Sequence, residues 1–137
     1  MTTGVEALAL LKGAFETEWG DTTPIAWRNV AFDPEKVEDK DAGWVRCGLI
    51  FAGSDPDIEI GTTNTRRNAL VMIECFAPEG SGEERLATLS DKAERWLAKW
   101  PLNDLTVLTP EVIDVGPDGE GWTQHNVNAP CYFDSNG

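Results

Sequence analysis

The chain has 137 residues, a length that fits one domain able to bury a core without disulfides or metals. Its 11 Lys and Arg residues are outnumbered by 24 Asp and Glu residues, which gives a formal net charge of −13. Duplex DNA repels such a surface, because affinity for nucleic acid comes largely from neutralised phosphates, so sequence-specific DNA binding is not expected. An acidic lining would suit a passage through which DNA slides, although acidity also simply keeps a protein soluble.

Signals for membranes, secretion and disulfides are weak throughout the sequence. No apolar run approaches the roughly 18 residues of a membrane span, and residues 1–11 lack the basic region and cleavage site of a signal peptide. We therefore expect a cytoplasmic protein. Cys47, Cys75 and Cys131 are odd in number and form no C-x-x-C pair, and their apolar neighbours predict buried thiols.

A helix is predicted near the start of the chain. Thr3 and Glu6 form a capping-box pattern, and Gly20 and Pro24 mark the end of the helix. Between them, apolar residues recur at helical spacing, namely Val5, Leu8, Leu11 and Phe15.

Three strand segments and a polar loop follow. Residues 24–30 read as a short strand, with Ile25 and Trp27 on one face, and residues 33–41 read as an exposed, mobile loop. Residues 44–51 alternate as a strand does, with Val45, Cys47, Leu49 and Phe51 on one face and Trp44, Arg46 and Ile50 on the other. We expect a turn over residues 53–56, a short strand over 58–62, and a strand buried on both faces over 69–76.

The second predicted helix begins near a capping box of Ser81 and Glu84 and ends after Trp100, because Pro101 follows. Its inward face holds Leu86, Leu89, Ala93, Leu97 and Trp100. Residues 105–108 and 112–115 look like strands, residues 116–119 a hairpin turn, and residues 122–133 the returning strand. This order predicts an α+β fold over residues 1–137, a single domain with a mainly antiparallel sheet and both helices on one face.

Catalytic chemistry is hard to find in this sequence. His125 is the only histidine, and Cys131, six residues further along the same strand, lies out of its direct reach. Asp114, Asp118 and Glu120 could offer oxygens to a hard cation, but their spacing is not that of a calcium loop, and a solvated hairpin explains them better. We therefore expect no enzyme, no metal and no cofactor.

Arg66 and Arg67 form a basic pair in an acidic chain, either as a solvated strand end or as one side of a contact between subunits. The predicted contact set comprises that pair with the acidic residues of the loop and the hairpin, namely Arg66, Arg67, Asp33, Glu35, Glu38, Asp39, Asp41, Asp114, Asp118 and Glu120.

Several stretches, read in order, resemble the tail terminator proteins of long-tailed bacteriophages and a related group of small uncharacterised phage proteins. The stretches are residues 24–34, residues 44–46, Gly61 with Arg66 and Arg67, residues 76–80 before the helix, residues 121–130, and Tyr132 with Phe133. Together they cover nearly the whole chain, and the specificity lies in the ordered set. Asn68 departs from the small Gly that is common after the Arg in that family.

The resemblance implies two helices against an antiparallel sheet and a ring, usually of six subunits, that sits on the end of the tail tube. The subunit can be monomeric before it assembles. The ring stops addition of tube subunits, receives head-completion proteins on its other face, and lets DNA pass through. The resemblance also implies that the protein assembles in the host cytoplasm and is then part of the virion tail. Alternatives are a head-completion or neck protein, and a small cytoplasmic ligand-binding or hydrolytic domain using Asp114, Asp118 and His125.

Overall fold

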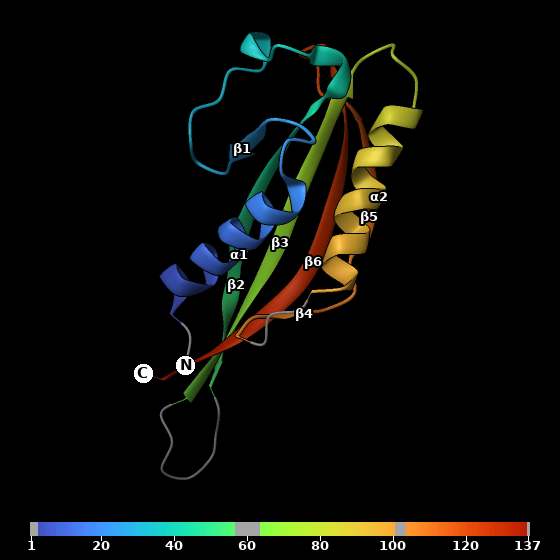
Figure 1. Cartoon of the computed structure of the whole chain (residues 1–137). Helices are drawn as coiled ribbons and strands as arrows, with labels where there is room; N and C mark the ends of the chain where they lie inside the picture. Colours follow the sequence, from blue (N-terminus) through green and yellow to red (C-terminus); the bar gives the residue numbers. More distant parts are fainter. Residues whose placement is uncertain (1–2, 57–63, 101–103, 137) are drawn as a thin grey trace.

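The structure is a computed structural model that describes residues 3–56, 64–100 and 104–136 (Figure 1). Those residues form an α+β fold of helices packed against one mostly antiparallel sheet, as the sequence predicted. The elements in chain order are α1 (Gly4–Trp19), β1 (Ile25–Trp27), the 3-10 helices η1 (Pro34–Lys36) and η2 (Lys40–Ala42), β2 (Trp44–Pro56), β3 (Asn64–Pro78), α2 (Glu84–Ala98), β4 (Thr106–Val107), β5 (Glu111–Pro117) and β6 (Trp122–Asn136).

The sheet is built around three long strands. Its order is β1-β2-β3-β6-β4, and β5 pairs with the earlier part of β6, beside β4. Only β1 and β2 are parallel to each other; every other pair is antiparallel. Strands β1, β2 and β6 therefore run one way, and β3, β4 and β5 run the other way.

The main core lies between the helices and one face of the sheet. Alternate residues of the long strands, such as Val45, Val71 and Val127, are fully buried in one cluster with inward residues of both helices. The rings of Phe15 in α1 and Trp96 in α2 lie 5.3 Å apart, so the helices also contact each other. Both helices therefore cover the same face of the sheet, as Figure 1 shows.

A second, aromatic cluster lies on the opposite face of the sheet. Trp44 stacks on its register partner Phe76 with ring centroids 4.0 Å apart, and Trp122 meets Trp44 edge-on at 6.1 Å. Phe32 packs 4.8 Å from Trp44, and Ala26 completes the cluster. Because side chains alternate across a strand, Trp44 faces away from the core that its neighbour Val45 enters.

The first helix confirms its predicted cap at Thr3. The hydroxyl of Thr3 accepts a hydrogen bond from the backbone N–H of Glu6 at 3.1 Å. Leu11 and Phe15 are fully buried, whereas Val5 is 80% exposed. Val5 has the helical spacing of the apolar residues but lies outside the buried face, which runs through Ala7 instead.

The second helix begins without the predicted capping box. The hydroxyl of Ser81 donates to the carbonyl of Pro78 at 2.6 Å, in a turn, and the helix starts at Glu84 with no side-chain cap. The last helical residue is Ala98 rather than Trp100. Its inward face matches the prediction, because Leu86, Leu89, Ala93 and Leu97 are all buried.

Two predicted turns are parts of strands. Strand β2 runs on to Pro56, where a turn over residues 53–56 was expected, and a bulge between Phe51 and Gly53 absorbs the irregularity. Phe51 pairs with the core residue Ala69 and so shares the face of Val45 and Leu49 as predicted, although it is 47% exposed. Gly116 and Pro117 belong to β5, so the turn falls on the next residues. The strand expected over residues 58–62 lies outside the described residues.

Candidate functional site

The acidic loop, residues 33–41, is folded into two short 3-10 helices. The carboxylate of Asp33 accepts from the N–H of Glu35 at 3.0 Å and caps η1. Lys40 pairs with Glu35 at 3.0 Å. The carboxylates are exposed, as predicted. Val37 is buried and anchors the loop, a contact that the polar composition of the loop did not predict. The mobility of this loop stays a prediction.

A cleft of about 620 Å³ opens beside the acidic loop. Pro24, Phe32 and Val37 supply apolar walls, and the acidic residues on its lining are Asp21, Asp33, Glu38 and Asp39. Asp33, Glu38 and Asp39 were predicted contact residues, and the structure brings them together here.

The acidic hairpin uses its three carboxylates in different ways. The carboxylate of Asp118 accepts from the N–H groups of Glu120 at 2.7 Å and Trp122 at 3.2 Å, so Asp118 holds the turn. Glu120 is exposed. Asp114 lies on β5, with its carboxylate 3.7 Å from Nε2 of His125.

The loop and the hairpin lie at the same end of the molecule, which we call the acidic end: residues 33–41, residues 118–121, and the exposed Glu79, Glu83 and Glu84 (top of Figure 1). Two long-range hydrogen bonds tie it together. The N–H of Glu79 donates to the carbonyl of Gly121 at 2.9 Å, and Nε of Arg85 donates to the carbonyl of Ala42 at 2.8 Å.

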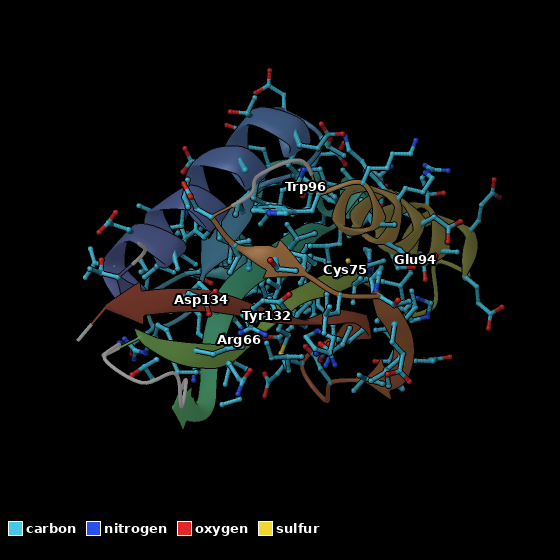
Figure 2. The ribbon with its side chains drawn as sticks, turned by 90° about the horizontal axis from the view of Figure 1, so that it is seen from below. Arg66, Cys75, Glu94, Trp96, Tyr132 and Asp134 are labelled. Carbon is cyan, nitrogen blue, oxygen red and sulfur yellow. The ribbon has the colours of Figure 1, made fainter. Side chains whose placement is uncertain are left out.

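Arg66 and Arg67 lie at the other end of the sheet. Nε of Arg66 donates to the carboxylate of Asp134 at 3.1 Å, and its guanidinium sits 4.2 Å from the ring centroid of Tyr132. The three residues are labelled in Figure 2. The guanidinium of Arg67 lies 5.1 Å from the ring of Phe51 on the opposite face. Both arginines are therefore engaged within their own subunit.

The predicted basic and acidic contact residues are far apart within one subunit. Arg66 and Cys75 are nine residues apart on β3, about 30 Å at the usual rise of a strand. Cys75 pairs with His125, which pairs with Asp114, so that distance also separates Arg66 from the level of Asp114. A contact between these two sets in neighbouring subunits needs an offset of that size along the strands.

Sequence reasoning missed a serine beside the histidine. Oγ of Ser90 on α2 lies 3.2 Å from Nδ1 of His125, on the opposite ring nitrogen from Asp114. Ser90 is 2% exposed, and its hydroxyl also lies 3.1 Å from the carbonyl of Ala87. Ser90, His125 and Asp114 therefore have the residue types of a hydrolytic triad, but the buried Ser90 hydroxyl is not accessible to a substrate. Ser90 follows Leu86 by four residues, and that spacing placed it on the inward face.

The three cysteines are buried thiols, as predicted. Burial raises the pKa of Cys75 to about 12 and that of Cys131 to about 11, and it raises the pKa of Cys47 even further. Because the thiolate is the reactive form, burial disfavours reaction at these thiols in the folded chain.

Neither a metal centre nor a membrane helix emerges from the described residues. No three of their His, Cys, Asp and Glu side chains are grouped so as to hold a metal ion. None of the described helices has the length and apolar character needed to cross a membrane.

Comparison with known proteins gives a likeness in fold. No family model and no curated protein matches the chain. Among solved structures, 24 chains match. One of them aligns over 92% of this chain and 93% of its own length, with a TM-score of 0.52 and 19% sequence identity. Identity this low shows a shared fold and nothing about activity.

Proposed function

We propose that this protein is a structural subunit of a bacteriophage tail that caps the finished tail tube. It acts as a ring of identical subunits, stops addition of tube subunits, and offers its other face to a head-completion protein. It carries out no catalysis. The protein assembles in the host cytoplasm and ends in the virion tail.

The observation that carries the proposal is where the stretches that resemble tail terminators lie. Phe32, Trp44, Phe76 and Trp122 come from four separate stretches, and all four side chains meet in the aromatic cluster. The Trp44 and Phe76 rings are nearly parallel, at 7°. The stretches therefore build one packed unit beside the acidic end, so the resemblance concerns a folded feature.

The distribution of charge supports a ring with two different faces. The acidic end and the Arg66–Arg67 pair lie at opposite ends of the long strands. If the strands run along the ring axis, one face of the ring is strongly acidic and the other carries arginines. Two faces of different chemistry suit a cap, because the face toward the tube and the face toward the head must bind different partners.

The capping mechanism needs only complementarity on one side. One face of the ring binds the last tube layer, and the other face offers no surface on which another layer can nucleate. A lining that shares the overall charge of −13 would let DNA pass without adhering to it.

Imaging of tails tests this proposal. Lysates that lack the protein should contain abnormally long tubes, and supplying the full chain should restore a single tail length. Tubes of normal length that fail to join heads would instead indicate the neck protein. Normal, infectious virions without the protein would reject both assignments.

A further inference from the structure

Strand β5 is a short edge strand that carries two carboxylates, Glu111 and Asp114. In the part of the chain that the structure describes, it pairs with β6 alone. Ile113 is 40% exposed and Val115 is 48% exposed. The bulge near Val115 and Pro117 limit the regular edge to residues 111–114. The charges on that stretch are negative, and no Lys or Arg follows Lys99 in the sequence, so the edge would accept a strand flanked by basic groups.

The opposite edge of the sheet is the three-residue strand β1, which pairs with β2 alone among the residues described, and the carbonyl of its Trp27 accepts from the N–H of Val30 at 3.1 Å. Basic and apolar groups flank it. The side chain of Arg28 lies across Gly48, where an added Cβ would be 2.6 Å from Cβ of Arg28. Nζ of Lys12 lies 5.4 Å from the ring centroid of Trp27, and Val30 is 55% exposed.

The charges on the two edges match in level and in face. Glu111 pairs with Asn128, which pairs with Met72, which pairs with Gly48. Arg28 crosses that same Gly48, so Glu111 and Arg28 lie at the same level. Both belong to the face without helices, because Gly48 alternates with inward residues of β2.

A second pair lies on the face that carries the helices. Asp114 pairs with His125, His125 with Cys75, and Cys75 with Val45 of β2, so Asp114 lies at the level of Val45. Trp27 of β1 pairs with Cys47, two residues after Val45 on β2. Lys12 stands over Trp27 on this face, and Asp114 points to the same side, where His125 lies. The two edges are thus complementary on both faces.

The strand directions allow the two edges to join. Strands β1 and β5 run in opposite directions. A second copy rotated about an axis parallel to the strands keeps those directions, so its β1 would lie antiparallel to β5 of the first copy. Repetition of such a head-to-tail contact gives a ring when the rotation closes.

We propose that the outer edge of β5 in one copy binds the β1 edge of a second copy of this chain. Main-chain hydrogen bonds extend the antiparallel sheet across the contact, and Arg28–Glu111 and Lys12–Asp114 pairs flank it. These pairs supply the local attraction that copies of charge −13 need. The inference rests on the proposed function in so far as that function requires a ring.

A charge swap tests the contact in the full chain. Arg28→Glu alone or Glu111→Arg alone should lower the association constant about three- to tenfold per contact, since each change replaces an exposed attraction by a repulsion. Both changes in one chain should restore association. Arg95→Glu, an equal charge change on the exposed side of α2, is the matched control and should leave association within about twofold. Sedimentation over a range of concentrations measures association, and circular dichroism checks each fold.

A crosslink tests the direction of the contact. Arg28→Cys and Glu111→Cys chains are mixed and treated with a short bismaleimide, both in solution and in recovered tails. The native thiols are buried and should not react. We expect crosslinks between the two variants, whereas crosslinks only between Glu111→Cys chains would indicate a two-fold contact and overturn the inference.

If the protein forms oligomers but the two cysteine variants give no crosslink, the inference is overturned and the proposed capping function is not. The same holds if the double variant Arg28→Glu with Glu111→Arg does not regain association. A chain that is monomeric at every concentration and absent from tails overturns both. Crosslinked rings in a phage whose tails need no cap overturn only the proposed function.

Discussion

Leu97 on α2 gives a direct measure of how the helices hold the sheet. Its side chain is 1% exposed and belongs to the main core with Leu89 and Ala93. Leu97→Ala removes three carbons, worth about 2.4 kcal/mol at about 0.8 kcal/mol per buried methylene. The cavity left behind adds up to about 2 kcal/mol, depending on how far the neighbours relax. We therefore expect a loss of about 2–5 kcal/mol in the free energy of unfolding.

Urea denaturation followed by tryptophan fluorescence measures that loss. Leu108→Ala is the matched control, because Leu108 is 48% exposed and the same truncation there should cost less than about 0.5 kcal/mol. If Leu97→Ala also costs less than about 0.5 kcal/mol, the packing of α2 on the sheet described above is refuted.

The remaining predictions concern a glycine, a thiol and the arginine pair. Gly43→Ala should lower the melting temperature far more than Gly80→Ala, because both have positive φ, but only at Gly43 would a Cβ lie 2.2 Å from a carbonyl oxygen of β3. Equal shifts would contradict this close approach. Burial raises the pKa of Cys131 from 9.0 to about 11, so the folded chain keeps a proton that the unfolded chain loses, and unfolding should become easier between pH 9 and pH 11. Urea titrations at each pH should show a smaller decline for Cys131→Ala. Reversing Arg66 and Arg67 to Glu should leave the circular dichroism unchanged, since the broken ion pair is half exposed and worth less than about 1 kcal/mol, yet it should block tail capping, because the pair lies on one face of the proposed ring. Rings and tails of normal length would remove this pair from the contact surface.

Periodicity was enough to predict the elements that bury one face. Helix α2 and strand β2 carry inward residues at regular spacing, and Leu89, Leu97, Val45 and Leu49 are buried as that spacing required. The α+β class followed from the order of these elements.

Local turn chemistry misled where distant pairing decided the structure. The run Gly-Ser-Asp-Pro at residues 53–56 is typical of a turn, but pairing with residues 65–68 of β3 holds it as a strand. Ser81 has the residue type of a helix cap, yet its hydroxyl binds a carbonyl before the helix. Such competition depends on partners that a local window does not contain.

The sequence was enough to single out the charged residues of the candidate site, but it did not predict which residues those side chains contact. The acidic loop, the hairpin and the arginines were singled out by charge alone. Arg66 meets Asp134 across 68 positions of sequence, and His125 meets Ser90 across 35. Only the register of β3 with β6 and the seat of α2 on the sheet create these contacts.

Both ends of the described chain lie on the side of the arginines. Helix α1 begins at Gly4, where an added Cβ would lie 3.3 Å from the guanidinium of Arg67, and β6 ends at Asn136, opposite Asn64. An epitope fused to either terminus would therefore mark the same side of each subunit, far from the acidic end. Gold-labelled antibody on assembled tails would then tell the two faces of the particle apart, and a bulky fusion would obstruct one docking partner selectively.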